Sequence, residues 1–367
     1  GKSCCRHSMV GRAEWTGANE RYLLCDFSGD GSIKIFPSAK STELLFLNKT
    51  DWDEFADATG ASEVDLETVE GLVDTAEKYY NWTDGQTEEP DDGKAFFGRD
   101  AMANYMFVGA KQLGVTLFEV ENGKMKLNFD KDTVRKLWDN YYVPYVKGYF
   151  SSSGRFRSDD IKTGNILAYT GSTSSATFFP KQVMTSETES HDIELEVLPT
   201  PEFAGGEKWA VQQGAGMVVT KGSDDEIKAS VEFLKWFTEP ENNTGFSVGS
   251  GYLPVTRKAT DMVGIHKSGT SGTELSESMD AVLTEAVETV NNNELYTTPA
   301  FEGGQDARSV LEYAMSDIAD ADRQTVQERI NEGQSMEEAV ADFISDEYFD
   351  NWYEETLTKL QAYEDGQ

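Results

Sequence analysis

The sequence predicts an α/β protein with two lobes, and three observations support this fold class. Short apolar runs typical of strands alternate with amphipathic stripes of helical period along most of the chain. A length of 367 residues corresponds to about two domains. Hydrophobic residues make up 38% of the sequence, which is enough to build a sizeable core and argues against global disorder.

The expected strands follow from apolar runs bounded by turn residues. The run 33–36 is expected to form a short strand that Pro37 ends, and the continuous apolar run 43–47 (ELLFL) indicates a buried strand. Glu121–Lys124 marks a hairpin turn. Further strands are expected at 166–170 and 193–198, and a buried strand at 216–220.

The expected helices follow from apolar positions at helical spacing. In 66–80, for example, residues 69, 72, 73, 76 and 80 form one stripe. Ser223 is a suitable N-cap for the helix at 227–237. The remaining helices are expected at 52–58, 101–113, 130–145, 275–290, 306–319, 335–343 and 348–363.

Charged residues and cysteines are distributed unevenly along the chain. All three cysteines, Cys4, Cys5 and Cys25, lie in the first 25 residues, which carry four basic and two acidic side chains. The net charge of −34 is therefore +2 on this start and −36 on the remainder. Such acidity argues against nucleic acid as a partner, because phosphate neutralisation needs a basic face. Residues 1–25 also lack the apolar region of a signal peptide.

Motifs for nucleotide, hydrolase and metal chemistry are missing from the sequence. It contains no GxGxxG, no GxxxxGK[ST], no GxSxG and no HExxH, and its three histidines are far apart. We therefore expect no catalytic residues, no cofactor and no metal. A carboxylate pair of glycosidase type is not excluded by counting acidic residues.

Three motifs in order resemble family 1 extracellular solute-binding proteins, the receptors of carbohydrate ABC importers and relatives of maltose-binding protein. They are 212–220 (QQGAGMVVT), 231–237 (VEFLKWF) and 249–255 (GSGYLPV). The segments 36–49 and 162–169 resemble the family's first crossing between lobes and a strand that leads to a ligand-facing loop. The resemblance implies a periplasmic-binding-protein-like type II fold with several chain crossings.

The resemblance also implies a division of the chain. Residues 1–25 are expected to be a segment foreign to the family. Residues 26–39 and 214–250 are expected to form a remnant of the N-terminal lobe, and 40–213 with 251–367 the C-terminal lobe. Family members carry more chain before the first crossing, so the N-terminal lobe is expected to be incomplete.

By the same resemblance, the chain binds a sugar or oligosaccharide between its lobes and delivers it to an ABC permease. It is expected to be a monomer at the cell surface, where family members are lipid-anchored. Aromatic faces stack on sugar rings, and polar side chains bond the hydroxyls. The expected ligand-binding residues are Lys40, Ser41, Arg99, Asp100, Ser172, Thr173, Gln213, Gly214, Tyr252, Phe301 and Gly303.

Two other functions stay open at this point. Arg155, Arg157 and Lys40 could bind an anionic metabolite such as glycerol phosphate in the same fold, although arginines in such loops often pair with local acids such as Asp159 and Asp160. A glycoside hydrolase with a carboxylate pair is the alternative from a different class of protein.

Overall fold

The computed structural model describes residues 35–184, 186, 188–263 and 275–366, so the cysteine-bearing start lies outside the described residues. The described chain forms two compact units. Unit 1 comprises residues up to Leu44, 172–177 and 210–298, and unit 2 comprises 45–171, 178–209 and 299 onwards. The chain therefore passes from one unit to the other at five places along the sequence.

Unit 2 is built on a four-stranded sheet in the order β3-β6-β2-β9. Strand β3 runs parallel to β6, with Arg99 paired to Thr170. The central strand β2 is buried at every position, as expected for a continuous apolar run. The strands are β2 (Glu43–Asn48), β3 (Phe97–Arg99), β6 (Ala168–Ser172) and β9 (Leu195–Pro199).

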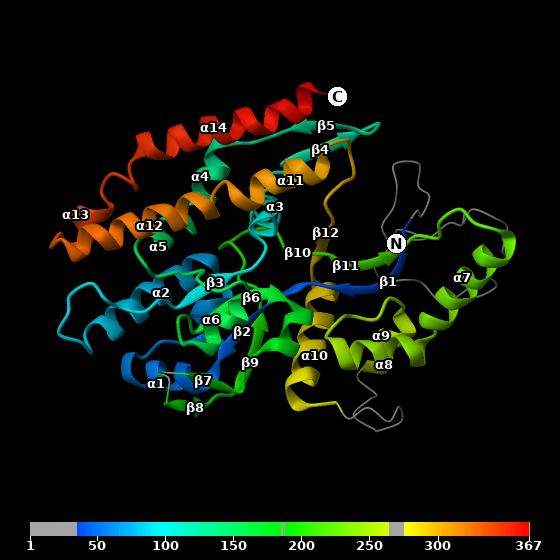
Figure 1. Cartoon of the computed structure of the whole chain (residues 1–367), viewed down its shortest axis with the longest axis horizontal. Helices are drawn as coiled ribbons and strands as arrows, with labels where there is room; N and C mark the ends of the chain where they lie inside the picture. Colours follow the sequence, from blue (N-terminus) through cyan, green and yellow to red (C-terminus); the bar gives the residue numbers. More distant parts are fainter. Residues whose placement is uncertain (1–34, 185, 187, 264–274, 367) are drawn as a thin grey trace. The chain divides into compact units, whose positions relative to one another are not determined.

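Helices and two hairpins complete unit 2, and Figure 1 shows α11, α12 and α14 as one helical layer. The hairpins are β4 (Phe118–Glu121) with β5 (Lys124–Leu127), and β7 (Gln182–Met184) with β8 (Ser190–Asp192). The helices are α1 (Lys49–Thr59), η1 (Glu63–Glu67), α2 (Val69–Asp84), α3 (Met102–Gln112), α4 (Lys131–Asp139), α5 (Tyr142–Val146), α6 (Arg157–Lys162), α11 (Gly304–Tyr313), α12 (Ser316–Asn331), α13 (Met336–Val340) and α14 (Asp346–Asp365).

Aromatic side chains dominate the core of unit 2. Trp52, Phe55 and Phe96 pack together with ring centroids 5.6 to 6.4 Å apart. Trp138 of α4 stacks on Tyr142 of α5 with ring centroids 3.6 Å apart, and Trp138 is 1% exposed. Large buried rings contribute much of the hydrophobic stabilisation of such a core.

Unit 1 joins an antiparallel strand pair to helices that follow it in the sequence. Strand β1 (Phe36–Ser41) pairs with β11 (Gln213–Met217), and β10 (Trp209–Val211) pairs with β12 (Glu294–Tyr296). Asn243 is fully buried and joins this unit by donating to the Ser38 carbonyl at 2.9 Å and accepting from the Val255 N–H at 2.8 Å. The helices are η2 (Thr173–Phe178), α7 (Asp224–Phe237), α8 (Pro240–Ser250), α9 (Arg257–Val263) and α10 (Glu277–Asn292).

Two expectations about unit 1 are wrong. Pro37 does not end a strand but lies inside β1, where the pairing register shifts between Pro37 and Ala39. A bulge of this kind tolerates proline, which has no N–H to donate to the strand pairing. The expected buried strand at 216–220 is also displaced: β11 ends at Met217, which is 37% exposed, and Val218 is 60% exposed.

The observed division also differs from the expected lobes. Residues 251–298 lie in unit 1, whereas the sequence placed them in the C-terminal lobe. The correspondence between these units and the lobes of the family stays a prediction.

Candidate functional site

In unit 1, strand pairing brings four of the expected ligand-binding residues together. Lys40 lies opposite Gly214, and Ser41 lies opposite Gln213. Gly214 has a φ of 106°, and a side chain there would meet the Lys40 Cα at 2.7 Å. Only glycine therefore allows this close approach of the two strands. Lys40 and Ser41 are 3% and 2% exposed, so their contribution to binding depends on backbone groups or on movement of unit 1.

Two further expected residues, Thr173 and Tyr252, lie near this strand pair. Lys40 forms a bridge with Leu253, the residue after Tyr252, through backbone bonds of 3.2 and 2.5 Å. Gly251, the residue before Tyr252, approaches the backbone of Thr173. The Tyr252 ring stacks on that of Phe246, with the ring centroids 6.1 Å apart, and Tyr252 is half-buried.

The loop after β6 is bonded mainly to itself. The Ser172 hydroxyl lies 3.0 Å from that of Ser174, and the Ser172 carbonyl accepts from Ser175 at 2.6 Å. Thr173 is fully buried and donates its N–H to the Thr42 carbonyl at 3.0 Å. The Thr173 hydroxyl is buried without a hydrogen-bond partner among the described residues, so this turn does not satisfy all of its own polar groups.

In unit 2, Arg99 and Asp100 lie at the carboxyl end of β3. The Asp100 N–H bonds the Thr170 carbonyl of the parallel neighbour β6 at 2.9 Å. Ligands of open α/β sheets bind outside the carboxyl ends of the strands. The Arg99 guanidinium lies over the ring of Tyr105, 5.0 Å from its centroid, a cation–π contact that orients it.

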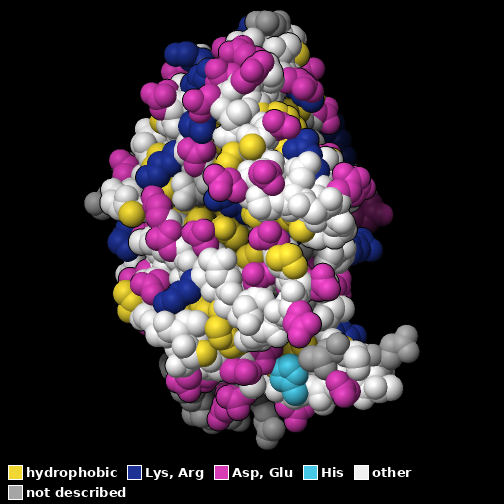
Figure 2. Space-filling model, turned by 90° about the vertical axis from the view of Figure 1, so that its left-hand side faces the viewer, with side chains coloured by type: hydrophobic (Ala, Val, Ile, Leu, Met, Phe, Trp, Pro, Cys, Tyr) yellow, Lys and Arg dark blue, Asp and Glu magenta, His cyan; other side chains and the backbone are white. Residues whose placement is uncertain are grey.

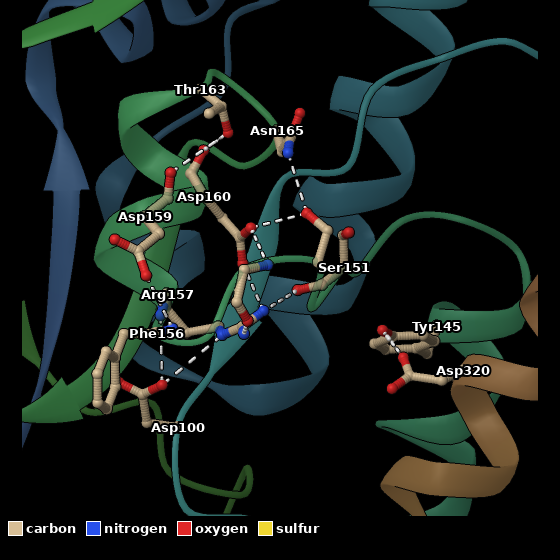
Figure 3. Close-up of polar contacts among 12 residues, drawn as sticks. Asp100, Tyr145, Ser151, Phe156, Arg157, Asp159, Asp160, Thr163, Asn165 and Asp320 are labelled. Carbon is tan, nitrogen blue, oxygen red and sulfur yellow. Dashed lines mark hydrogen bonds and ion pairs between the residues drawn. The ribbon is translucent and has the colours of Figure 1, made fainter.

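Arg157 occupies the centre of a buried ion cluster around Asp100 (Figure 3). Its Nη1 lies 2.5 Å from Asp160 Oδ2, and its Nε lies 3.6 Å from Asp100 Oδ1. Its Nη2 donates to the Gly154 carbonyl at 2.5 Å. The side chains of Arg157 and Asp160 are 4% and 1% exposed, while that of Asp100 is 27% exposed. Arg157 thus holds Asp100 in place and is not itself presented to solvent.

Burial raises the pKa of two carboxyl groups near this cluster. Desolvation raises the pKa of Asp100, against the opposing effect of the Arg157 charge. Desolvation also raises the pKa of Asp320, which accepts a hydrogen bond from Tyr145. Figure 3 shows Tyr145 and Asp320 facing one another, with Asp320 on a separate helix from Tyr145.

The turn into α3 carries backbone strain. Ala101, between Asp100 and α3, has a φ of 51°, in the left-handed region that residues other than glycine avoid. Ala101 provides no side-chain cap for α3. Instead, the Glu312 carboxylate of α11 accepts from the N–H groups of Met102 at 3.0 Å and Ala103 at 2.9 Å. Strain of this kind concentrates at functional sites.

The last two expected residues lie at the start of α11 in unit 2. Phe301 packs edge-on against Phe118 at 5.6 Å, and Gly303 caps α11 with a φ of 77°. Both therefore have evident structural roles. Glu312, at the other end of α11, is the residue of this helix that contacts the first turn of α3, directly after Asp100.

Sequence reasoning missed three contributors to this region: Tyr105, Asp320 and Glu312. Glutamate and aspartate are so frequent here that no local signal distinguishes these two. Tyr105 was expected only as part of a helix. Figure 2 shows the reason for the difficulty, because acidic side chains are spread over the whole face in view, with Lys and Arg among them.

The part of the chain that the structure describes contains no group of three or more His, Cys, Asp or Glu side chains arranged to hold a metal ion. Among the same residues, no helix has the length and apolar character needed to cross a membrane.

Comparison with known protein families gives a match over residues 14–271 to the bacterial extracellular solute-binding proteins. A comparison with curated sequences gives no match. Among solved structures, UgpB from Mycobacterium tuberculosis in complex with glycerophosphocholine is similar, with 18% identity and a TM-score of 0.63 over 94% of this chain and 75% of that chain.

Two further structures show the same similarity. An ABC transporter solute-binding protein from Agrobacterium radiobacter K84 in complex with ribitol has 16% identity and a TM-score of 0.59, over 91% of this chain and 72% of that one. The sugar-binding protein MalE from Xanthomonas citri has 15% identity and a TM-score of 0.58, over 91% and 73%. These similarities confirm the predicted periplasmic-binding-protein type II fold.

Proposed function

Because the chain belongs to the bacterial extracellular solute-binding proteins, we propose that it is the substrate-binding component of an ABC importer and takes up a sugar or oligosaccharide. The mechanism is non-catalytic. Two lobes close on the ligand by hinge bending, and the ligand's stronger binding to the closed form shifts the equilibrium toward it. The closed form is then recognised by the permease.

The fixed carboxylate of Asp100 is the observation that carries the carbohydrate assignment. A carboxylate held at the carboxyl end of β3 by Arg157 is a preorganised acceptor for sugar hydroxyls. The half-buried Tyr252 in unit 1 adds an aromatic ring, the kind of group that stacks on the C–H surface of a sugar. Solved structures similar to this chain include proteins bound to ribitol and described as sugar-binding.

An anionic ligand is the second candidate, and one similar structure binds glycerophosphocholine. Two of the basic residues that suggested it are poorly placed. Arg157 is paired with Asp160 and Asp100, and Lys40 is 3% exposed. Arg155 lies over the neighbouring Phe156 ring at 5.3 Å. Carbohydrate therefore remains the first assignment.

Three finer features belong to the same proposal. The protein acts without catalysis, it works as a monomer with permease subunits as partners, and it is held at the outer cell surface by a lipid anchor. The match to extracellular solute-binding proteins supports them. A glycoside hydrolase would need a pair of carboxylates that can react with the substrate. The carboxylates of Asp100 and Asp160 are both paired with Arg157.

The test is a ligand screen by thermal shift, followed by calorimetry on the full chain. Neutral mono- and oligosaccharides are expected to raise the melting temperature. Tyr252→Ala should weaken binding of the best saccharide about tenfold, or about 1.4 kcal/mol. Tyr313→Ala is the matched control, because it removes the same ring from an exposed position. Tyr313 is 58% exposed and lies on α11 of unit 2, whereas Tyr252 belongs to unit 1. Absence of a shift with every saccharide would refute the carbohydrate assignment.

A further inference from the structure

Unit 2 contains a cavity that is separate from the candidate site. Its volume is about 700 Å³, which is within the usual range for sites that hold small organic ligands. All of its lining residues belong to unit 2. Ala95, Ile166 and Leu167 line it, so it lies at the amino ends of the parallel strands β3 and β6. Arg99 and Asp100 are at the carboxyl end of β3, and neither lines the cavity.

The cavity wall carries a buried hydroxyl that has no partner. Tyr79 of α2 is 8% exposed and lines the cavity. Its hydroxyl makes no hydrogen bond with any residue that the structure describes, whereas the hydroxyls of Tyr105, Tyr142 and Tyr353 each have a partner. Buried polar groups without a partner are rare in folded proteins. In a cavity wall, such a group points to a ligand that completes its hydrogen bonding.

The Tyr79 hydroxyl is held in one place and stays protonated. The rings of Phe55 and Phe96 pack around the Tyr79 ring, with centroids 5.2 and 5.6 Å away. Burial raises the pKa of the Tyr79 hydroxyl, and the carboxylates of Asp51 and Glu54, which also line the cavity, act in the same direction. The hydroxyl is therefore close to these carboxylates and can both donate and accept a hydrogen bond at neutral pH.

Three neighbouring groups of the lining also have unused binding capacity. Trp82, three residues after Tyr79, is half-buried, and the two ring centroids are 5.9 Å apart. Neither the Trp82 indole N–H nor the charged groups of Glu54 and Lys94 have a partner among the described parts of the chain. In contrast, Arg323 donates to a backbone carbonyl at 3.2 Å. We therefore assign the ligand contacts to the wall around Tyr79 and Trp82.

The charges of the lining determine the class of ligand. Asp51 and Glu54 are acidic, whereas Lys94 and Arg323 are basic, so the formal charges cancel when His191 is neutral. His191 is bonded to Asp51 at 2.7 Å. A ligand with a net charge would leave that charge uncompensated, which is costly in a partly buried site. Hydroxyl groups match the phenol, the indole N–H and the carboxylate together, and an indole ring packs well on the C–H surface of a sugar.

We propose that this cavity is a second ligand site, in which Tyr79, Trp82 and Glu54 bind a neutral polyhydroxylated molecule of the size of a mono- or disaccharide. The Tyr79 hydroxyl and the Glu54 carboxylate bond the hydroxyls of the ligand, and the Trp82 ring packs on its apolar face. The site goes beyond the proposed transport function, because it lies within one unit and uses neither Asp100 nor Tyr252.

The experiment replaces tryptophan by 5-fluorotryptophan in the full chain and follows the Trp82 resonance by fluorine NMR. The variant Trp82→Phe identifies this resonance among those of the seven tryptophans. The probes are ribitol, methyl α-glucoside and maltose, with putrescine and inorganic phosphate as charged comparisons. At least one neutral probe should shift the Trp82 resonance to saturation, and the charged probes should not.

Tyr79→Phe is the decisive variant, because it removes only the unpartnered hydroxyl. Binding of the best neutral probe should weaken about tenfold, as expected for the loss of one hydrogen bond. The melting temperature without probe should stay the same or rise, because no hydrogen bond within the protein is lost. Glu54→Gln, at an exposed position, should weaken binding about threefold and decides the question if Tyr79→Phe does not fold.

Tyr353→Phe is the matched control, because it makes the same chemical change outside the cavity. Tyr353 is 7% exposed, belongs to the same unit and donates to the Phe129 carbonyl at 2.5 Å. This variant should leave the Trp82 shift unchanged and should lower the melting temperature, because it does lose a hydrogen bond within the protein.

The outcomes separate this proposal from the carbohydrate assignment. The second site is overturned by the absence of a saturable shift with every neutral probe, by a shift with putrescine or phosphate only, or by equal affinity in wild type and Tyr79→Phe. A Trp82 shift that Tyr79→Phe weakens and Tyr252→Ala does not supports the second site, whatever Tyr252→Ala does to the calorimetric binding of saccharides.

Discussion

Replacement of Asp160 by asparagine tests the buried ion cluster that positions Asp100. The change is isosteric and leaves Arg157, 4% exposed, without the carboxylate 2.5 Å from its Nη1. Removing one partner of a buried pair costs about 3–5 kcal/mol. Asp100 at 3.6 Å and the Gly154 carbonyl at 2.5 Å still contact the guanidinium, so we expect a loss near the lower end, about 3 kcal/mol.

The assay is urea unfolding followed by tryptophan fluorescence. Unit 2 holds Trp52, Trp82, Trp138, Trp209 and Trp352 of the seven tryptophans, so the signal reports mainly on that unit. With a slope of about 3 kcal/mol per molar urea, the midpoint should fall by about 1 M. The double variant Arg157→Met/Asp160→Asn should be more stable than the sum of the single losses predicts, with a coupling of about 1–3 kcal/mol.

The control is Asp159→Asn, the same chemical change one residue earlier at an exposed carboxylate that only accepts the Phe156 N–H at 3.2 Å. It should cost no more than about 1 kcal/mol. If Asp160→Asn is as mild as Asp159→Asn, the reasoning that this cluster stabilises unit 2 through paired charge is refuted.

Three other changes test local features. Ala101→Gly should raise the stability of unit 2 by up to about 1 kcal/mol, because glycine adopts a φ of 51° without strain; an unchanged or lower melting temperature would contradict this. Asp130→Ala should cost about 1 kcal/mol in urea unfolding at pH 7. Hydrogen bonds from Thr133 lower the pKa of the Asp130 carboxyl in the folded state, so this difference should shrink as the pH falls below about 4; a difference independent of pH would count against the cap. Trp138→Ala should cost about 3–5 kcal/mol in the same assay, because a ring 1% exposed and stacked on Tyr142 leaves a cavity; a loss under about 1 kcal/mol would contradict that packing.

Much of the secondary structure was predictable because its causes lie within a few residues. Ser223 caps α7 through the N–H of Glu226, three residues on, as the sequence indicates. The hairpin between β4 and β5 turns at Asn122 and Gly123, which tolerate positive φ. The buried strand at 43–47 followed from its uninterrupted apolar run.

Prediction failed where pairing partners are distant. Pro37 looks like the end of a strand, yet β1 continues through it because β11, about 175 residues later, accommodates a shift in register. The expected burial of 216–220 was wrong for the same kind of reason, since an apolar run does not reveal which of its faces a partner covers.

In the candidate site, too, features with local causes were predictable and contacts between distant residues were not. Residue types and motif order were sufficient to indicate a solute-binding protein, because motifs are local in sequence. The ligand-binding roles of Arg99, Asp100 and Tyr252 stay a prediction. Whether Arg157 binds an anion or pairs with Asp160 was open until the fold brought Asp100 to its other side. The contact of Glu312 with the start of α3 joins residues more than two hundred positions apart. No local pattern encodes such a contact, because it exists only after α11 and α3 have packed together.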